Sequence, residues 1–289
     1  MTDGLVVVDK PAGMTSHDVV SRCRKIFGQK RVGHAGTLDP DATGVLLVGL
    51  GQATRLMQFM SGLGKSYDAK IVLGVATNTL DAAGEVTGEW DMSSVTPDQV
   101  REAAATLTGD LLQVPPMVSA LKVGGKRLHA LAREGIEIER KARPVRVERF
   151  DVVSQDGNLV DASIDCSSGT YVRVLAADLG TALGGGAHVR QLRRTAVGPW
   201  KLDDATGLDR LDESSVIPPA GCVPWLERIQ VDADLATKVA NGRVLDMDTL
   251  GASGQGPWSV VDRAERLLAV YQRHRSLEAK PVVVLANPS

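Results

Sequence analysis

The sequence predicts an α+β fold, with a large domain over residues 1–228 and a small β-rich domain over residues 229–289. Strand and helix patterns alternate irregularly, without the steady rhythm of a doubly wound sheet. At Ser214–Gly221 the composition turns to proline and small residues. Beyond this segment come three short strand-like runs, at Trp258–Val261, Leu267–Tyr271 and Val282–Leu285. A chain of 289 residues is long enough for both domains.

The first predicted elements are a strand and a helix. Leu5–Val8 is a short apolar run that predicts the strand. Thr15 or Ser16 can cap the helix, because both hydroxyl side chains accept hydrogen bonds from free backbone N–H groups. The predicted apolar face of this helix consists of Val19, Val20, Cys23 and Phe27. Gly28 is predicted to end it.

The next segment, Gly33–Gly44, is predicted to be a glycine-punctuated loop that brings a histidine and an acid close together. These two residues are His34 and Asp39. Val45–Leu50 follows and is apolar enough to be a buried strand. A loop anchored to a core strand can hold a reactive carboxylate, but glycine and proline are equally typical of an ordinary turn.

Further strands and helices are predicted along the large domain. Tyr67–Leu73 alternates between its two faces and residues 159–165 do the same, so each predicts a strand. A capping-box pattern at Thr96 begins a helix that Gly109 ends. Thr170 is predicted to cap another helix.

Composition restricts the chemistry to ordinary side chains. Cys23, Cys166 and Cys222 are far apart and form no Cys-x-x-Cys pair, and the five histidines lack metal-ligand spacing. No disulfide, metal site or cofactor is therefore expected. No apolar run approaches the roughly 20 residues needed to cross a bilayer, so we expect a cytoplasmic protein with no membrane partner.

Charge is segregated along the chain although the net charge is only −2. Basic residues gather within 22–31, 122–149 and 190–194, and acidic residues gather within 203–213 and 232–248. Such segregation can create a face that attracts phosphates. Solvated helix faces are the simpler alternative.

Two glycine patterns resemble nucleotide-binding loops without meeting their requirements. Gly64-Lys65-Ser66 looks like the end of a phosphate-binding loop, but Phe59 stands where the first glycine is needed. Gly49-Leu50-Gly51 lacks the third glycine of a dinucleotide fingerprint. Neither a nucleoside-triphosphate enzyme nor a dinucleotide enzyme is predicted.

The remaining polar and aromatic residues are ambiguous when each is taken alone. Asp39 is also typical of a turn, Tyr67 of a half-buried strand and Arg173 of a helix surface. Aromatic residues make up only 3% of the chain, so Tyr67 and Tyr171 beside charged loops carry additional weight.

The order of short motifs along the chain resembles one family. The motifs span nearly the whole predicted large domain and are Asp9–Ser16, Gly33–Gly44, Lys65–Tyr67, Val114–Lys122, Gly169–Arg173 and His188–Arg194. In this order they resemble the tRNA pseudouridine-55 synthases of the TruB family, with a short actinobacterial type of C-terminal module. The resemblance implies the pseudouridine-synthase fold, in which helices flank a central mixed or antiparallel sheet, followed by a PUA-like RNA-binding domain.

The resemblance also implies the chemistry. This family isomerises the T-loop uridine 55 of tRNA, after base flipping, by replacing the N1–C1′ bond with a C5–C1′ bond. It implies that Asp39 is the nucleophile, that Tyr67 stacks on the uracil and can take its C5 proton, and that Arg173 pairs with the nucleophile. Further substrate contacts are implied at His34, Asp81, Tyr171, Lys10, Lys122, Arg127 and Arg193. Attack at C1′ and attack at C6 both stay open.

The implied partner is the T-arm stem-loop of tRNA, bound by a monomer without a guide RNA. The basic segment from about residue 122 to residue 149 is implied to grip this RNA, mainly through phosphates. Two other functions stay open at this point. One is a non-catalytic helper of tRNA folding, and the other is an aspartate-dependent nucleoside hydrolase that releases free uracil.

Overall fold

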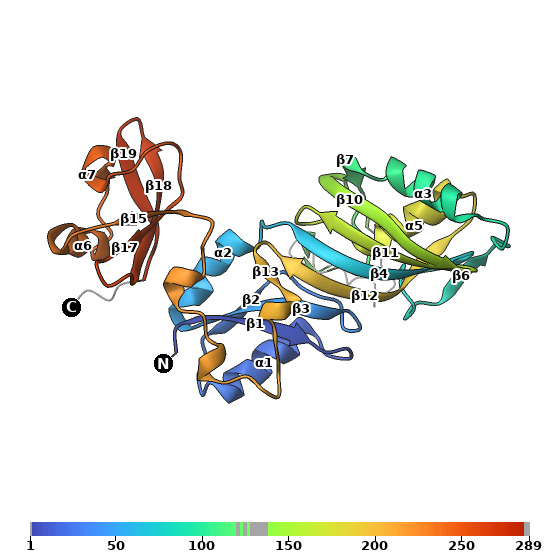
Figure 1. Ribbon diagram of the computed structural model, residues 1–289, viewed down its shortest axis with the longest axis horizontal. Helices are drawn as coiled ribbons and strands as arrows, with labels where there is room; N and C mark the ends of the chain where they lie inside the picture. The colour runs from blue at the N-terminus through green and yellow to red at the C-terminus, as the bar shows by residue number, and fades with distance from the viewer. Residues whose placement is uncertain (1, 120–121, 124–125, 128–137, 286–289) are drawn as a thin grey trace.

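A ten-stranded mixed sheet forms the body of the protein (Figure 1). The structure is a computed structural model that describes residues 2–119, 122–123, 126–127 and 138–285. The main path of the sheet is β14-β1-β3-β12-β4-β11-β10-β7, and β2 pairs with β3 and β13 with β12. The strands are β1 Gly4–Lys10, β2 Val32–Ala35, β3 Thr43–Leu50, β4 Lys65–Leu73, β7 Gly109–Gln113, β10 Arg143–Asp156, β11 Leu159–Cys166, β12 Ala187–Val197, β13 Trp200–Lys201 and β14 Thr206–Gly207. Only the β1–β14 and β3–β12 pairs are parallel among these described strands.

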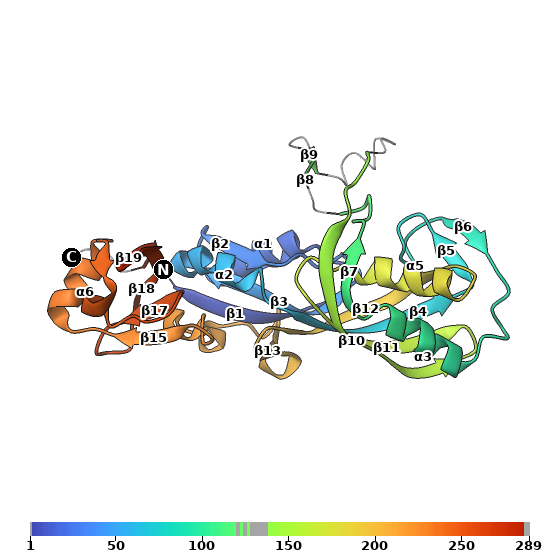
Figure 2. The same cartoon turned by 90° about the horizontal axis from the view of Figure 1, so that it is seen from above.

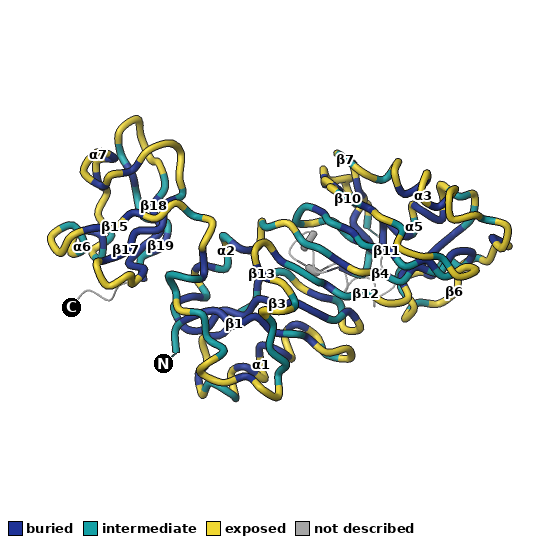
Figure 3. Tube along the Cα trace, in the orientation of Figure 1, coloured by how far each residue is buried: buried dark blue, intermediate teal, exposed yellow. Residues whose placement is uncertain are grey.

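Three helices share one apolar core with this sheet. They are α1 Ser16–Ile26, α3 Pro97–Thr106 and α5 Val172–Ala182. Alternate residues of the central strands are buried in this core, among them Val6, Val48 and Ile71, and buried segments follow the strands (Figure 3). The predicted α+β fold is therefore confirmed. In the part of the chain that the structure describes, no helix is long and apolar enough to span a membrane.

Several local predictions are confirmed by hydrogen bonds and burial. Thr15 is the N-cap of α1 and forms a capping box with Asp18, and Thr96 does the same for α3 with Gln99. On β4, the residues predicted to share a face are all buried: Tyr67, Ala69, Ile71 and Leu73. Both helices and this strand thus form where local sequence and burial agree.

The predicted loop Gly33–Gly44 is shorter in the structure. His34 lies on β2, opposite Val48 of β3, instead of in the loop. The strand forms because β2 can complete the backbone hydrogen bonds of β3 and bury its two end residues. The loop proper is Gly36–Ala42, and it carries Asp39.

The prediction that Thr170 caps a helix is wrong. The N-cap of α5 is Tyr171, and no side-chain cap accompanies it. Gln113 on β7 holds the N-cap residue itself, because its Oε1 accepts a 2.7 Å hydrogen bond from the Tyr171 N–H. Thr170 contacts Ser167 instead, with 3.3 Å between their hydroxyl oxygens.

A second sheet of five strands lies at the C-terminal end of the molecule (Figure 1). Its order is β15-β17-β18-β19-β16, with bounds β15 Glu227–Gln230, β16 Leu245–Asp246, β17 Trp258–Val261, β18 Leu267–Arg275 and β19 Glu278–Val284, and it is accompanied by α6 Ala233–Ala240 and α7 Met247–Leu250. The three predicted strand runs are confirmed. Val261, Val270 and Val283 share an apolar cluster with β1 and β3 of the main sheet. The division after residue 228 stays a prediction.

The remaining elements are short. The helix α2 Met57–Met60 follows the 3-10 segment Gly51–Leu56, and three further 3-10 turns lie at Leu202–Asp204, Glu213–Ser215 and Pro219–Gly221. Two small hairpins pair β5 Val75–Thr77 with β6 Val86–Glu89, and β8 Lys122–Val123 with β9 Lys126–Arg127. Figure 2 shows β8 and β9 outside the main sheet, beyond β7 and β10.

Gly44 allows β3 and β12 to approach each other directly behind the Asp39 loop. Its φ is +101°, and a Cβ at this position would lie 2.1 Å from the carbonyl oxygen of Arg194. Any side chain would therefore meet both backbone strain and a clash with fixed backbone.

We expect Gly44→Ala to lower the free energy of unfolding by more than about 1 kcal/mol, because alanine fits neither the backbone angle nor the space. Urea unfolding measures this change. Gly62→Ala is the matched control, since no atom lies within 4 Å of its added Cβ. Equal effects of the two substitutions would contradict this account.

Candidate active site

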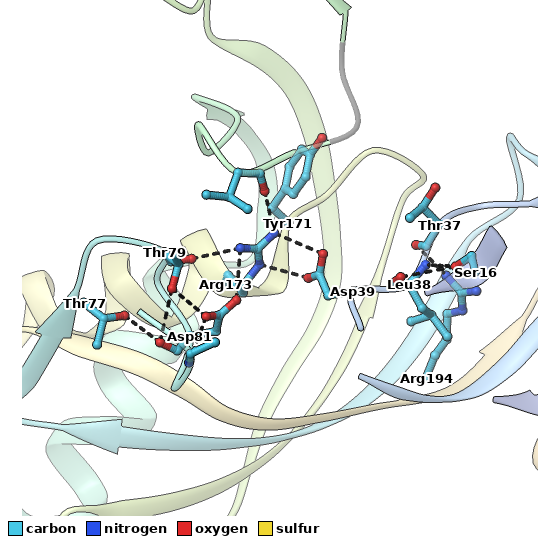
Figure 4. A network of polar contacts seen from close by, with 12 residues as sticks. Ser16, Thr37, Leu38, Asp39, Thr77, Thr79, Asp81, Tyr171, Arg173 and Arg194 are labelled. Atoms are coloured by element: carbon cyan, nitrogen blue, oxygen red, sulfur yellow. Dashed lines mark hydrogen bonds and ion pairs between the residues drawn. The ribbon is translucent and has the colours of Figure 1, made fainter. Parts of the chain in front are cut away.

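Arg173 is the centre of a polar network in which every guanidinium N–H has an acceptor (Figure 4). Its Nε and Nη2 contact the two carboxylate oxygens of Asp39 at 3.0 and 3.2 Å. The other donors reach Asp81 Oδ2 at 3.1 Å and the carbonyl oxygens of Thr79 and Val118 at 2.9 and 2.8 Å. Arg173 is only 4% exposed, whereas the Asp39 side chain is 40% exposed. The bidentate pair fixes the orientation of a carboxylate that a ligand can still reach.

Asp81 is held in place by its own turn. Its Oδ1 accepts hydrogen bonds from Thr79 Oγ1 at 2.6 Å and from the Ala83 N–H at 3.2 Å. Leu80 has a φ of +63°, which is unusual for a residue with a side chain. Backbone hydrogen bonds with Val189 of β12 flank this turn on both sides of Asp81. The local strain is therefore maintained by the central strand of the main sheet.

The loop that carries Asp39 is attached to the start of α1. Ser16 Oγ accepts a 2.9 Å hydrogen bond from the Leu38 N–H. Lys10 is fully buried, and its ammonium group donates to three backbone carbonyls, those of Pro11, Met14 and Pro40. Burial lowers the pKa of Lys10 to about 8, against the opposing charges of Asp41 and Asp39. Its three donors are thus used by the protein, and the contact with Pro40 ties Lys10 to the Asp39 loop. A substrate contact of Lys10 stays a prediction.

Arg194 on β12 is a site residue that our sequence reasoning did not single out. It is 1% exposed and donates to the carbonyl oxygens of Val45, Gly36 and Thr37. It is also hydrogen-bonded to the side chain of Tyr67. A second arginine thus fixes both the loop and the tyrosine. Its burial could not be predicted from the sequence, because Arg194 follows Arg193 directly and nothing local distinguishes the two.

Asp39 and Arg173 form a shared wall between two cavities. One, of about 300 Å³, is also lined by Tyr67, Tyr171 and Lys65. The other, of about 380 Å³, lies on the side of Asp81. Both volumes are within the range of small-ligand sites, so the structure brings together the five predicted residues Asp39, Tyr67, Asp81, Tyr171 and Arg173 around space that a ligand can enter.

Burial dominates the electrostatics of the cavity. It raises the pKa of Asp39, with Arg173 opposing this change and Asp81 adding to it. Burial also raises the pKa of Tyr67 and of Tyr171, so both rings carry a protonated phenol at neutral pH. Arg173 thus lies between two carboxylates, and the half-exposed one, Asp39, shares a cavity with the ring of Tyr67. A carboxylate in this setting can attack a planar base or its sugar.

Comparison with known proteins identifies the family. Residues 24–172 match the TruB family pseudouridylate synthase (N terminal domain), and residues 173–218 match the tRNA pseudouridylate synthase B C-terminal domain. The chain is 47% identical over 289 residues to tRNA pseudouridine synthase B of Mycobacteroides abscessus, covering 97% of this chain and 96% of that protein. It belongs to the TruB family of pseudouridylate synthases.

Other relatives and solved structures agree with this assignment. The tRNA pseudouridine synthase B of Rhodococcus jostii is 47% identical over 290 residues, covering 98% of this TruB-family chain and 93% of its own. A crystal structure of a Cbf5-Nop10-Gar1 complex has a chain that matches with a TM-score of 0.77 and 25% identity, covering 99% of this chain and 85% of that one. An H/ACA RNP bound to a substrate RNA containing 2′-deoxyuridine shares the fold, with a TM-score of 0.75, 23% identity, and coverage of 99% and 86%.

Four predicted residues of this TruB-family site lie away from Arg173 or cannot be placed. His34 packs edge-on against His17, with 5.4 Å between ring centroids, and it is not among the residues that line the Asp39 cavities. Arg193 is half-exposed and pairs with Asp9 at 2.8 Å. The side chains of Lys122 and Arg127 lie outside the described residues, although their backbones form β8 and β9. Within the described ranges, no cluster of three or more His, Cys, Asp or Glu residues could hold a metal ion.

We expect Asp81→Asn to lower the pKa of Asp39 in this TruB-family protein, because it removes the neighbouring negative charge that disfavours ionisation. Carbon-13 NMR titration of the Asp39 carboxyl measures the change without any substrate. Asp98→Asn, at an exposed aspartate on α3, should leave the titration unchanged. An identical Asp39 titration in all three proteins would show that Asp81 does not act on Asp39.

Proposed function

We propose that this protein converts uridine 55 in the T-loop of tRNA to pseudouridine, with Asp39 as the nucleophile. The observation that carries the proposal is the bidentate contact of Arg173 with the half-exposed Asp39, across a cavity from Tyr67. Curated relatives with matching length are named tRNA pseudouridine synthase B, which supports tRNA as the substrate.

The reaction needs no net oxidation and no external group. The N1–C1′ bond breaks, the C5–C1′ bond forms, C5 loses a proton, and N1 gains one. If Asp39 attacks C1′, it displaces uracil and is itself displaced by C5. If it attacks C6, the ester that forms at the ring is broken after the base has turned over. In either course the carboxylate must be ionised, which Arg173 favours against the effect of burial.

The target base must leave its stack to reach Asp39, at a cost of a few kcal/mol. Stacking on an aromatic side chain offsets part of this cost, by about 1–3 kcal/mol per base. Tyr67 and Tyr171 line the cavity and supply two such rings. We assign Tyr67 to stacking and to removal of the C5 proton. For the second role its phenol must first lose its own proton, which the hydrogen-bonded Arg194 favours against the effect of burial. We assign Tyr171 to substrate binding.

The remaining predicted contacts belong to the same proposal. The basic segment 122–149 grips the T-arm, with Lys122 and Arg127 as phosphate contacts, while Arg193 and His34 contact RNA outside the cavity. Residues 229–289 act as a PUA-like RNA-binding domain. The proposal includes a cytoplasmic monomer that works without a guide RNA. The name of the near-full-length relatives supports only the tRNA substrate.

We expect Asp39→Asn to reduce pseudouridine formation in an unmodified T-arm stem-loop by at least about 10⁴-fold, because the amide cannot act as the nucleophile. Binding should be retained. Chemical mapping of pseudouridine measures the product, and a filter-binding assay measures affinity. Asp41→Asn is the matched control, since Asp41 lies in the same turn and does not contact Arg173.

Three outcomes would argue against this function. Full turnover by Asp39→Asn would exclude Asp39 as the nucleophile. Release of free uracil by the wild-type protein would identify a hydrolase. Refolding of tRNA without any pseudouridine, at every enzyme concentration, would identify a non-catalytic folding helper.

We expect Tyr67→Phe to bind the stem-loop within about twofold of wild type, because phenylalanine keeps the stacking ring. Turnover should fall by about 10²-fold or more, since the variant lacks the hydroxyl that takes part in proton transfer. Single-turnover kinetics with excess enzyme separate the two effects. Normal turnover would remove the hydroxyl from the mechanism and leave Tyr67 with stacking alone.

A further inference from the structure

Three cations line the Asp39 cavity, and two of them are buried arginines with several hydrogen-bond acceptors each. All five N–H groups of Arg173 have acceptors. Arg194 is 1% exposed, and its donors point at three backbone carbonyls and Tyr67. Neither guanidinium can turn toward a ligand without losing several hydrogen bonds. The third cation, Lys65, is different.

Lys65 has one N–H that no acceptor among the described residues takes. Its Nζ donates to the carbonyl oxygens of Leu63 at 2.8 Å and of Ser61 at 3.4 Å, which leaves one of three donors. Lys65 stands two positions before Tyr67 on β4, so both side chains leave the strand on the same face. A Cβ added to Gly36 in the Asp39 loop would lie 3.4 Å from Lys65 Cε. The ammonium is thus held between the loop and the tyrosine.

We propose that Lys65 binds a phosphodiester of the flipped nucleotide, next to the target uridine, while that base lies against Tyr67. The proposal rests on the proposed function, because it needs an RNA substrate in this cavity. A flipped nucleotide brings its backbone charge toward the cavity mouth, and a partly buried cation with a spare donor meets that need. Lys65 is a substrate-binding residue in this account, and Asp39 and Tyr67 remain at the reacting atoms.

Charge balance in the free protein supports this assignment. Burial lowers the pKa of Lys65 to about 8, with repulsion from Arg194 as a further cause and with Cys166 opposing it. A phosphate would supply the negative charge that this partly buried ammonium lacks. The described residues do not provide an ion pair to Lys65.

The first test compares the kinetics of Lys65→Met and Lys65→Arg on the T-arm stem-loop. We expect Lys65→Met to raise KM about ten- to a hundredfold with a much smaller change in kcat, and Lys65→Arg to restore most of the loss. The plot of log affinity against log salt should become shallower by about 0.7 to 0.9, the value of one phosphate contact. Lys70→Met is the matched control, because Lys70 lies on the opposite face of β4 and pairs with Asp161.

The second test combines the Lys65 substitution with a change at one phosphate of the RNA, to measure whether the two groups interact. A stem-loop with one uncharged methylphosphonate, on either the 5′ or the 3′ side of the target uridine, removes the charge that Lys65 is proposed to bind. At one of these two linkages we expect wild type to lose affinity to nearly the level of Lys65→Met, and Lys65→Met to lose little more. If the affinity losses from Lys65→Met and from the methylphosphonate multiply at both linkages, the two groups act independently and the proposal is overturned.

A pH series gives an independent measurement. Wild-type affinity should fall as the pH rises from about 7 to about 8.5, because Lys65 loses its proton in this range. The fall should be smaller in Lys65→Arg, where Lys10, whose pKa is also about 8, still titrates. The other groups facing Lys65 are Arg194, Tyr67, Cys166 and Asp39. Burial raises the pKa of Tyr67 and raises that of Cys166 to about 11, so neither titrates in this range.

Other results would assign Lys65 differently. A loss of kcat with unchanged KM and salt slope would make it a proton acceptor, and a lowered melting temperature with unchanged kinetics would make it a support for the Ser61–Leu63 turn. Either result overturns the phosphate contact. If wild type forms no pseudouridine, the proposed function fails, whereas an active wild type with an equally active Lys65→Met refutes only this inference. If Lys65→Met does not fold, the methylphosphonate substrates with wild type and Lys65→Arg still decide it.

Discussion

The five occupied N–H groups of Arg173 are the constraint on which the site depends. They join Asp39, Asp81 and the carbonyl groups of Thr79 and Val118, which come from three segments far apart in the sequence. A guanidinium is planar and rigid, so the five acceptors must hold fixed positions at once. The positions of the Asp39 loop and of the strained turn at Leu80 are therefore both set by Arg173, at the start of α5.

Two opposed requirements meet at Asp39. Shielding from water strengthens contacts with a substrate, but it also disfavours the ionised carboxylate, as the raised pKa shows. Arg173 compensates only in part, because Asp81 shares the same cation. Among the described cations that line the cavity, Lys65 then has positive charge available for a ligand. In this arrangement Lys65 binds the charge of the substrate, whereas Asp39 reacts with the nucleotide.

Local patterns predicted much of the fold, whereas long-range contacts had to be seen in the structure. The helix cap at Thr15 or Ser16, the capping box at Thr96 and the alternating face of β4 are short-range features. The structure confirms the box and the face, and it selects Thr15 as the cap. The resemblance supplied Asp39 and Arg173, and the structure places them in contact. The burial of Lys10 and Arg194 could not be predicted, because the carbonyls that surround each of them become neighbours only after folding. His34 was placed in a loop for the same reason, since its strand exists through pairing with β3.

The position of β12 has a consequence for synthesis on the ribosome. β3 and β4 follow each other along the chain, yet β12, Ala187–Val197, lies between them in the sheet. A nascent chain that has not reached Ala187 therefore carries two separate half-sheets with open edges, and the turn that presents Asp81 lacks its partner Val189. When β12 emerges, it would join the two half-sheets and at the same time complete the Arg173 network. Truncated translation products would then lack catalytic activity and expose strand edges, which makes them substrates for chaperones and proteases.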